Sequence, residues 1–344
     1  MVKTNLGSYN RTKIRNNCLN SSGSEVVALV VNYNSGTKIV ECLKMLLSQS
    51  YKPAKIIAID NASTDGSREL ILKEFGSNRR VILLFNDRNL GYAKAVKIAA
   101  LKYPAKFYFL VNPDVILPND YILSLIDVIK SKPFCKILSG VILSEDGRII
   151  LSMGAFFDPI TGYDWHTGWK REYKSLSKEL IKADYIPLTA ALVSGDILMD
   201  IDERYFLYNE DLDLGILVNG KQYDCYVYTG VAANHLVKLR SRSLRKTRIY
   251  HHVKGRLYLL YKYEPMPFLL TSTFCWLILL PLILVLVDYG LALTCIKAIA
   301  DFIKELSNFT VVRKERVHLF ALKMKPISAL KAIMRHIAIG GHLW

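Results

Sequence analysis

The sequence predicts an α/β fold, with a mostly parallel sheet flanked by helices and a helical, membrane-associated segment after it. Short apolar segments rich in β-branched residues alternate with amphipathic segments of helical length from Val26 onward, which is typical of strand–helix–strand units. Such units place parallel strands in one sheet through right-handed crossovers. A stretch of 20 residues without a charge, 268–287, follows much later and is long enough to cross a lipid bilayer.

The first part of the chain contains a regular series of expected elements. In order, they are a strand at 26–32, a helix at 37–50, a strand at 55–60, a helix at 65–75, a strand at 80–85, a helix at 91–102 and a strand at 106–112. The first helix carries Ile39, Leu43, Leu46 and Leu47 on one face, and Asp65 is a suitable N-cap for the second. The strands are apolar over most of their length, as expected of strands that are covered on both faces.

Polar side chains follow each of these strands. The strand ends read Asn32-Tyr33-Asn34, Asp60-Asn61, Asn86-Asp87 and Asn112-Pro113-Asp114. In open α/β sheets, ligands bind outside the carboxyl ends of the strands, so these residues are candidates for a binding site. Asn and Asp also favour turns and helix N-caps, which explains two such ends more readily than four.

The chain lacks the glycine-rich loops that hold phosphates in two common nucleotide sites. No G-x-G-x-x-G follows the first strand, and no G-x-x-x-x-G-K-[ST] occurs anywhere, so dinucleotide and P-loop sites are poorly supported. Without such a loop, a nucleotide diphosphate needs a cation to neutralise it. Asp114 lies where Mg²⁺ or Mn²⁺ could be held, since both ions take carboxylate and phosphate oxygens.

Charge and hydropathy restrict the partners. The 344-residue chain has 46 Lys and Arg against 30 Asp and Glu, a net charge of +16, and 51% of its residues are hydrophobic. This combination favours a negatively charged partner beside a lipid phase, in particular anionic membrane lipid. A basic chain can also bind nucleic acid, but no RNA- or DNA-binding signature occurs, so no nucleic-acid partner is expected.

The cysteines and the N-terminal residues carry no sign of secretion. The six cysteines are widely spaced, without a C-x-x-C pair, and are expected to be small buried hydrophobic side chains in a reducing compartment. Residues 1–24 are polar and basic without an apolar core, so we interpret them as a flexible basic arm and not as a signal peptide.

An acidic cluster lies in the second half of the chain. Glu210, Asp211 and Asp213 follow an aromatic segment and open a helical pattern. Carboxylates in a first helical turn are stabilised by the helix macrodipole, so a solvated helix start is one interpretation. The other is a catalytic carboxylate cluster. The residues alone leave both open.

Several motifs resemble those of a known enzyme family. The segments "VVNYNSGTKIVECLKMLLSQSYKPAKIIAIDNASTDGS", "NLGYAKA" and "FLVNPDV" look like the nucleotide-sugar-binding half of family 2 glycosyltransferases with the GT-A fold. Asn-Pro-Asp in place of Asp-x-Asp is closest to the rhamnosyltransferase-like branch. The resemblance implies a GT-A domain at 25–245, with a nucleotide-binding half at 25–118 and an acceptor half at 119–245.

The resemblance also implies that a nucleotide-diphosphate sugar donor binds at the strand ends. In the family, the carboxylate matching Asp60 accepts the imide N–H of uracil or thymine, and an ionised acceptor makes this hydrogen bond strong. The alternative for Asp60 is an N-cap of the next helix. The implied donor-binding residues are Asn32, Tyr33, Asn34, Asp60, Asn61, Ser63, Asp65, Asn89, Gly91, Lys94 and Asn112.

The same resemblance gives roles to the acidic cluster and to a histidine. "FLYNEDLDL" is similar to the acceptor-side motif whose Asp, here Asp211, is the catalytic base, and Glu210 and Asp213 would position the acceptor and raise the pKa of the base. His235 lies where the family has a histidine near the metal, so Asp114 and His235 are the implied metal ligands. A histidine after a strand is also often structural.

The chain departs from the family pattern at three places. Lys97 replaces a usual asparagine in the diphosphate loop, and "GIL" at 215–217 replaces the usual arginine after the acidic motif. The stretch before "DERYF" is shortened. These departures put the donor sugar in doubt more than the reaction class.

The remaining residues, 246–344, are expected to form a helical, membrane-associated C-terminal region. Besides the apolar segment 268–287, a second segment at 290–303 is apolar but carries Lys297 and Asp301. Basic residues flank both segments, so the positive-inside rule favours a hairpin or re-entrant pair with both ends in the cytoplasm.

The sequence therefore predicts a membrane-bound, metal-dependent inverting glycosyltransferase at the cytoplasmic face of the cell membrane. Its donor would be a dTDP- or UDP-sugar, with rhamnose as one candidate, and its acceptor a lipid-linked saccharide or polysaccharide. A processive polysaccharide synthase would need more membrane spans and a Q-x-x-R-W-like motif, which is absent. A non-catalytic glycan-binding or scaffold protein is the third interpretation, although Asp114 and Asp211 are both present. Linkage and oligomeric state stay open.

Overall fold

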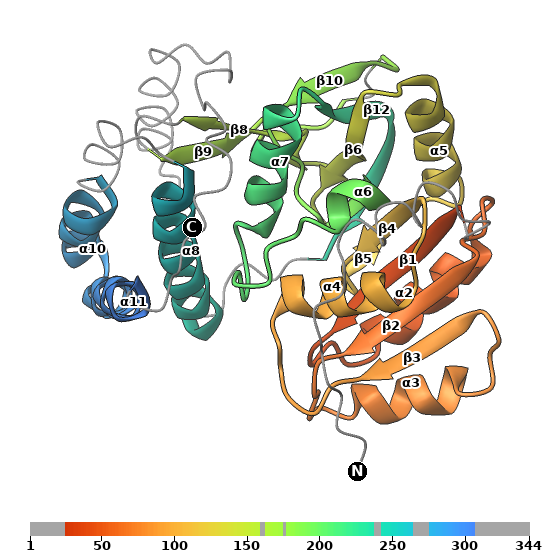
Figure 1. Cartoon of the computed structure of the whole chain (residues 1–344), viewed down its shortest axis with the longest axis horizontal. Helices are drawn as coiled ribbons and strands as arrows, with labels where there is room; N and C mark the ends of the chain where they lie inside the picture. The colour runs from red at the N-terminus through yellow and green to blue at the C-terminus, as the bar shows by residue number, and fades with distance from the viewer. Residues whose placement is uncertain (1–24, 159–161, 175–176, 237–241, 264–274, 307–344) are drawn as a thin grey trace.

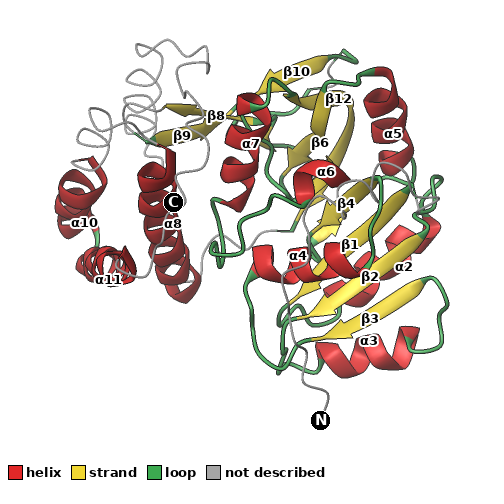
Figure 2. Cartoon of the chain, viewed as in Figure 1, coloured by secondary structure: helices red, strands yellow, loops and turns green. Residues whose placement is uncertain are grey.

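The structure is a computed structural model of the chain, and it describes residues 25–158, 162–174, 177–236, 242–263 and 275–306. One large sheet runs through the molecule, and helices cover both of its faces (Figure 1; Figure 2). The order of its main strands is β10-β12-β6-β11-β4-β1-β2-β3. The expected arm at 1–24 lies outside the described residues.

The N-terminal half forms a parallel sheet, as its sequence predicts. Its strands are β1 (Val26–Asn32), β2 (Lys55–Asp60), β3 (Val81–Phe85) and β4 (Phe107–Val111). β1 pairs in parallel with both β2 and β4, and β2 pairs in parallel with β3. The direction in which strands are added therefore reverses between β1 and β4, and such a reversal opens a crevice at the carboxyl ends of the strands.

The second half makes the sheet mixed, which corrects the expectation of a mostly parallel sheet. β11 (Ala190–Ser194) runs antiparallel to both β4 and β6 (Cys135–Leu143). β10 (Leu180–Ala183) runs antiparallel to β12 (Asp224–His235), which itself is parallel to β6. Parallel neighbours need a crossover, usually a helix, whereas the described chain between β6 and β11 contains only short strands, so β11 returns antiparallel.

Four short strands complete the β structure. β5 (Val115–Ile116) pairs with β12, and β7 (Ile150–Ser152) pairs with β6. β8 (Ala155–Asp158) and β9 (Tyr163–His166) form a separate two-stranded sheet.

Two hydrophobic cores lie on the two faces of the large sheet. The first contains α4 (Tyr92–Lys102), α6 (Gly195–Leu198) and α7 (Glu210–Gly220), and the second contains α2 (Lys38–Ser48), α3 (Ser67–Phe75) and α5 (Tyr121–Ser131). Along β1, Val27 and Leu29 join the first core, while Ala28 and Val30 join the second. Because successive side chains alternate between faces that are both covered, the strand is apolar throughout.

The C-terminal part of the described chain is helical, as expected. It consists of α8 (Arg242–Tyr263), a π-helical turn (Cys275–Leu279), α10 (Leu280–Val287) and α11 (Tyr289–Leu306). α8 packs along α11, α11 contacts α10, and the three helices lie at the opposite end of the molecule from β3 (Figure 1). α11 buries Leu291, Cys295, Ala298 and Phe302, which share one helical face.

The apolar segment expected at 268–287 is only partly covered by the structure. Residues 268–274 lie outside the described ranges, and the remainder forms the π-helical turn and α10. Among the described residues, no helix combines the length and the apolar character needed to cross a membrane. The second expected segment, 290–303, lies within α11 and is amphipathic.

The described cysteines match the expectation of small buried side chains. Cys42, Cys135, Cys225 and Cys295 are all buried and unpaired. Burial raises the pKa of the Cys42 and Cys135 thiols to about 12, which makes both groups poor nucleophiles.

Gly215 marks the closest approach between α7 and the segment after β10. A Cβ on Gly215 would lie 2.3 Å from Tyr185 Cβ and 2.5 Å from Asp184 O. We expect Gly215→Ala to lower the free energy of unfolding by about 1–3 kcal/mol, because the overpacking outweighs the gain of about 1 kcal/mol in helix propensity. Chemical denaturation measures this, with Gly220→Ala, at the exposed end of the same helix, as the control. A stabilised Gly215→Ala protein would contradict the packing.

Candidate active site

The carboxyl ends of β1 and β2 are joined by a buried hydrogen-bonded cluster. Asn32 Nδ2 lies 2.8 Å from Asp60 Oδ1, 2.9 Å from Ser67 Oγ and 3.0 Å from Ser63 Oγ. Asp60 Oδ2 accepts a further bond from the Ser63 N–H at 3.2 Å. Asn32, Asp60 and Ser67 are almost fully buried, so the protein itself holds this turn in place.

Asp60 is not the N-cap of the next helix. α3 begins only at Ser67, whose N–H donates to Asp65 Oδ1 at 3.0 Å and whose hydroxyl donates to the same oxygen at 2.6 Å. Gly66, with φ +84°, occupies the position between them. Gly66 is therefore the N-cap, and not Asp65 as predicted, although the Asp65 carboxylate accepts both bonds from Ser67 one position before the cap. The Asp60 side chain remains at the end of β2.

The loop after β1 lies against the loop after β2. The Asn34 N–H donates to Ser63 Oγ at 3.0 Å, and the Gly36 N–H donates to Asp65 Oδ2 at 2.8 Å. Tyr33 is 51% exposed beside them. Residues that the sequence assigns to the donor site thus meet at one edge of the sheet.

Asn61 connects the end of β2 to the predicted diphosphate loop. Its Nδ2 donates to Asn89 Oδ1 at 3.2 Å and to Gly91 O at 3.1 Å, and its Oδ1 accepts a bond from Asn86 Nδ2 at 2.8 Å. Gly91 has φ +81°, and a Cβ there would lie 2.5 Å from Phe206 O. Glycine is required because this loop packs directly on the segment that leads to the acidic cluster.

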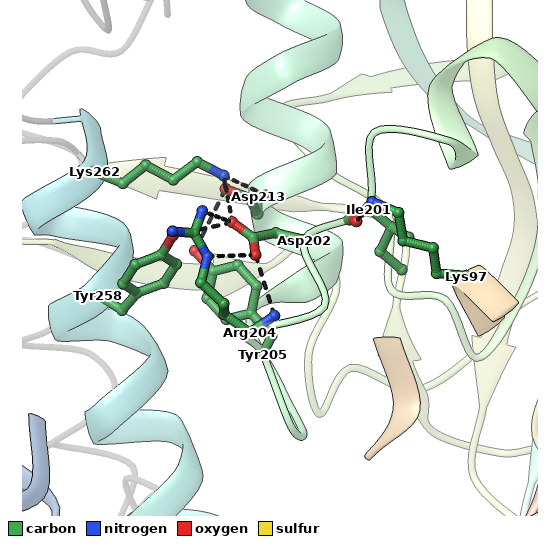
Figure 3. A network of polar contacts seen from close by, with 8 residues as sticks. All are labelled: Lys97, Ile201, Asp202, Arg204, Tyr205, Asp213, Tyr258 and Lys262. Atoms are coloured by element: carbon green, nitrogen blue, oxygen red, sulfur yellow. Dashed lines mark hydrogen bonds and ion pairs between the residues drawn. The ribbon is translucent and has the colours of Figure 1, made fainter. Parts of the chain in front are cut away.

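Two lysines of α4 contact the same second-half segment. Lys94 is partly exposed and lies 3.9 Å from the Glu203 carboxylate. Lys97 Nζ donates to Ile201 O at 2.9 Å (Figure 3). The lysine that replaces the usual asparagine therefore has a structural explanation, because it joins α4 to the backbone after α6.

Asp114 and His235 come together although they are far apart in the chain. β5 begins at Val115 and pairs with β12, in a register that sets His235 opposite Val115. His235 Nε2 lies 3.2 Å from Asp114 Oδ1. Burial acts to raise the pKa of Asp114, but the hydrogen bond and charge of His235 and the charge of Lys38 outweigh it, so the pKa stays below its usual value. The carboxylate is therefore ionised, as a metal ligand must be.

This pair fits a divalent cation. In octahedral coordination, two bonds of about 2.1 Å at right angles separate the ligand atoms by about 3 Å. The atoms of Asp114 and His235 are 3.2 Å apart. Among the described residues, no group of three or more His, Cys, Asp or Glu side chains is arranged to hold a metal ion, so phosphate oxygens and water would complete the shell. Asn112, at the end of β4, is half-buried and its N–H donates to Thr189 O at 3.0 Å.

Glu210 and Asp211 open α7 and differ in pKa. Burial, reinforced by the charge of Asp211, raises the pKa of Glu210 to about 8, and Glu210 Oε2 is buried without a hydrogen-bond partner among the described residues. Burial also raises the pKa of Asp211, to about 6, although the Leu212 N–H donates to its Oδ1 at 2.8 Å. The pKa of both carboxyls is raised, that of Glu210 further because the charge of Asp211 adds to its burial, so Asp211 is the more acidic of the two and the better candidate for the base.

The Asp213 carboxylate lies in a buried ion pair. It is fully buried, and its two oxygens are 2.8 and 2.9 Å from Lys262 Nζ of α8 (Figure 3). Tyr205 OH lies 3.4 Å from Asp213 Oδ1, and Lys262 also reaches Asp202 at 3.1 Å. The carboxylate of Asp213 joins α7 to α8, and the role of Asp213 in positioning the acceptor stays a prediction.

Sequence reasoning missed several side chains near Asp211. Tyr92 of α4 lies within electrostatic reach of it, as does Asp164 of β9. Asp164 pairs with the buried Arg256 of α8 and accepts a hydrogen bond from Tyr185 OH. No local motif marks these residues, since they come from elements that meet only in the folded chain.

The N-terminal half of the chain resembles known glycosyltransferases in sequence. Residues 27–177 match the model of the family described as glycosyl transferase family 2. Glycosyltransferase GlyG of Streptococcus pneumoniae is 28% identical over 143 residues, which are 41% of this chain and 46% of that protein. N-acetylglucosaminyl-diphospho-decaprenol L-rhamnosyltransferase of Mycobacterium tuberculosis is 27% identical over 213 residues, which are 54% of this chain and 68% of that protein.

Two solved structures share the fold. GalNAc-T7, solved with UDP, GalNAc and Mn²⁺, superposes with a TM-score of 0.54 at 12% identity over 71% of this chain and 48% of that chain. A mannosyltransferase of Pyrobaculum calidifontis, solved with GDP-Man and Mn²⁺, superposes with a TM-score of 0.50 at 15% identity over 96% of this chain and 87% of that chain. At these identities the likeness concerns the fold alone. Residues 27–177 thus resemble the glycosyl transferase family 2 domain in sequence, and the chain has a GT-A-like α/β fold.

Proposed function

We propose that this protein is a metal-dependent inverting glycosyltransferase that moves a sugar from a nucleotide diphosphate to a lipid-linked acceptor. The observation that carries the proposal is the position of the Glu210–Asp211 pair at the start of α7, directly after a segment that packs against the predicted diphosphate loop. Phe206 O of this segment accepts the Tyr92 N–H at 2.8 Å. Base and donor would therefore share one site.

Asp211 would act as the general base of the transfer reaction. Its carboxylate takes the proton of the acceptor hydroxyl while the hydroxyl oxygen attacks the anomeric carbon. The bond from that carbon to the phosphate oxygen breaks on the opposite face, and its electron pair leaves with the nucleoside diphosphate. A base whose pKa lies close to the working pH suits this step. The Asp211 residue is largely buried but keeps some solvent exposure, which leaves room for a hydroxyl to approach it.

Asp114 and His235 would hold the Mg²⁺ or Mn²⁺ ion. The bound ion would neutralise the charge that develops on the leaving diphosphate. Lys38 adds positive charge at the same place, since its Nζ donates to Leu236 O at 3.3 Å, directly after His235. Both solved structures that share the fold contain Mn²⁺, which supports a divalent ion here.

The donor and acceptor are proposed from separate observations. A pyrimidine nucleotide, as dTDP- or UDP-sugar, is proposed from the resemblance, in which the carboxylate matching Asp60 accepts an imide N–H. Asp60 is 1% exposed and already accepts bonds from Asn32 and Ser63, so the base would have to use a remaining lone pair. The matched relative from Mycobacterium tuberculosis is named for rhamnosyl transfer to a diphospho-decaprenol acceptor, which favours rhamnose and a polyprenyl-linked saccharide. The similarity of the two chains extends over 54% of this one, so it supports the class of acceptor more than the linkage.

We also propose that the protein works at the cytoplasmic face of the cell membrane. α10 and α11 expose apolar side chains, with Leu282 at 59%, Leu286 at 88% and Tyr289 at 65% exposure. Amphipathic helices of this kind lie in the interface plane and are held by apolar burial together with attraction of basic residues to anionic lipid. Lys246, at the start of α8, is exposed.

A donor screen tests the proposed function. Purified protein is incubated with UDP-, GDP- and dTDP-sugars, with and without Mn²⁺, and release of the nucleoside diphosphate is measured. We expect metal-stimulated release from a pyrimidine nucleotide-sugar. Release with formation of a long polymer would favour a processive synthase, and the absence of both turnover and nucleotide binding would favour a glycan-binding or scaffold protein.

If Asp211 is the catalytic base, its substitution should lower turnover without changing the affinity for the donor. Asp211→Asn should lower kcat by about 10²-fold or more with unchanged donor Kd, because the amide cannot accept the proton. Glu210→Gln should stay within a few-fold of wild type, since the amide resembles the protonated acid that burial produces. The acidic limb of the wild-type kcat profile should have its midpoint near pH 6, where Asp211 loses its base function on protonation. An inactive Glu210→Gln enzyme beside an active Asp211→Asn enzyme would move the base to Glu210.

If Asp114 holds the metal ion, metal-stimulated turnover should depend on its carboxylate. Asp114→Ala should abolish Mn²⁺-stimulated turnover and weaken binding of the nucleoside diphosphate in the presence of Mn²⁺, measured by calorimetry. Asp146→Ala removes an exposed carboxylate elsewhere and should change neither quantity. Full turnover in EDTA would rule out a metal-dependent reaction.

The membrane proposal predicts that an acidic residue on the apolar face of α10 weakens lipid binding. Leu286→Asp should lower partitioning onto vesicles that contain phosphatidylglycerol by about 10-fold or more, because burying a charge in the interface is unfavourable. Leu72→Asp is a matched control, because Leu72 is 55% exposed on α3 at the other end of the molecule. Flotation assays compare the two, and equal losses would contradict α10 as the contact.

A further inference from the structure

The two residues directly before the acidic pair adopt a strained backbone conformation. Tyr208 has φ +66° and Asn209 has φ +68°, and α7 begins with Glu210. Residues other than glycine avoid this left-handed region, so two in succession persist only where neighbouring elements hold them. The orientation of the first turn of α7 depends on this pair of residues, because they set the direction in which the chain enters the helix.

The first half of α8 contacts the segment that contains the strained turn. The ring of His251 stacks on Phe206, with centroids 4.8 Å apart and planes 17° from parallel. The Arg248 side chain hydrogen-bonds to the Tyr208 hydroxyl, and the charge of Arg248 acts on the same group. Both contacts lie within one turn of α8.

The middle of α8 contacts Asn209 itself. Asn209 Nδ2 donates to His252 O at 3.2 Å. The approach is so close that a Cβ on Gly255 would lie 2.6 Å from Asn209 Nδ2 and 3.4 Å from Tyr208 O. Gly255 lies inside α8 with an ordinary helical backbone, so the missing side chain, and not an unusual φ, is what the contact needs.

The end of α8 contacts the residues on both sides of the turn. Tyr258 OH donates to Asp202 Oδ2 at 3.1 Å, and its ring packs edge-on against Tyr205. Lys262 Nζ binds both oxygens of Asp213, as Figure 3 shows. The segment from Asp202 to Asp213 is therefore held by α8 before, at and after the strained turn.

These α8 residues share one face of the helix. Positions 248, 251, 252, 255, 258 and 262 recur at intervals of three and four, which is the spacing of a single helical face. An adjacent face contacts α11, where Tyr250 OH donates to Asp301 at 2.7 Å and Lys254 Nζ lies 2.6 Å from Glu305. One helix thus contacts both the segment that leads into α7 and the C-terminal helices.

We propose that α8 is the template that positions the Glu210–Asp211 pair, with Asn209 and Gly255 as the positioning residues at its centre. The proposal rests on the proposed function for the identity of the base, whereas the template itself rests on the contacts of α8. Neither residue touches substrate; each acts by fixing the turn that aims the base.

Two single substitutions separate positioning from general stability. Asn209→Gly removes the side chain that bonds to α8 but relieves the left-handed strain, because glycine adopts φ > 0 freely. Gly255→Ala improves the helix propensity of α8 but forces Asn209 Nδ2 away from His252 O. Both proteins should fold, and both should lose the hydrogen bond that joins the turn to α8. Lys254→Met is the matched control, because it removes an α8 contact on the face toward α11.

The test combines hydrogen exchange of the peptide 203–214 with kinetics. We expect faster exchange in this peptide for Asn209→Gly and Gly255→Ala, and wild-type exchange for Lys254→Met. For the nucleotide-sugar that supports turnover, kcat should fall by about 10- to 10²-fold in the first two variants, the effect of a small misplacement of a catalytic group. The Kd for dTDP or UDP with Mn²⁺ should stay unchanged. The double variant should be no worse than either single one, because both remove the same contact.

Each outcome decides the proposal. Unchanged exchange in both variants would overturn the template, whether or not a donor is found, so this arm is independent of the proposed function. Faster exchange with wild-type kcat would show that the turn does not position the base. A parallel fall of kcat, nucleotide affinity and melting temperature would show a structural role only. Faster exchange with a selective fall in kcat supports the proposal.

Discussion

The buried ion pair between Asp213 and Lys262 is the constraint on which the second half of the protein depends. A carboxylate that is fully buried has to be paired, because an isolated charge in the protein interior is strongly unfavourable. Lys262 satisfies both oxygens of Asp213 and also reaches Asp202. α7 and α8 therefore cannot separate without exposing or orphaning a charge, and the orientation of the Glu210–Asp211 pair is tied to α8.

Local patterns were sufficient to predict the parallel half of the sheet and which loops meet at its edge. Alternation of strands and helices predicted the parallel order, and polar strand ends predicted which loops meet, as the bonds from Asn32 to Asp60 confirm. The contact between Asp114 and His235 required one more step. Each residue adjoins a strand, and the pairing of β5 with β12 brings them within 3.2 Å. That pairing is a long-range register, which a single sequence does not encode locally.

The acidic cluster shows why the remaining roles could not be predicted. Asp211 and Asp213 are two positions apart on a helix, which turns about 100° per residue, so their side chains leave on nearly opposite sides. Periodicity therefore separates the two carboxylates but does not decide which one faces the protein interior. Asp213 faces the interior because Lys262, some fifty positions later in the chain, and Tyr205 contact its carboxylate there. The role of Lys97 could not be predicted for the same reason, because its hydrogen-bond partner Ile201 O lies in a part of the chain that no motif connects to α4.

The segment that leads to Glu210 and Asp211 lies between two parts of the protein. On one side it touches the donor half, through the close packing of Gly91 on Phe206 and the bond from Lys97 to Ile201 O. On the other side it touches α8, which in turn packs on α11. Because protein interiors are close-packed, a shift of α8 cannot be absorbed without moving the segment or breaking its contacts with the donor loop. A displacement of α11 would therefore be passed through α8 to the Glu210–Asp211 pair and to the loop around Gly91 together.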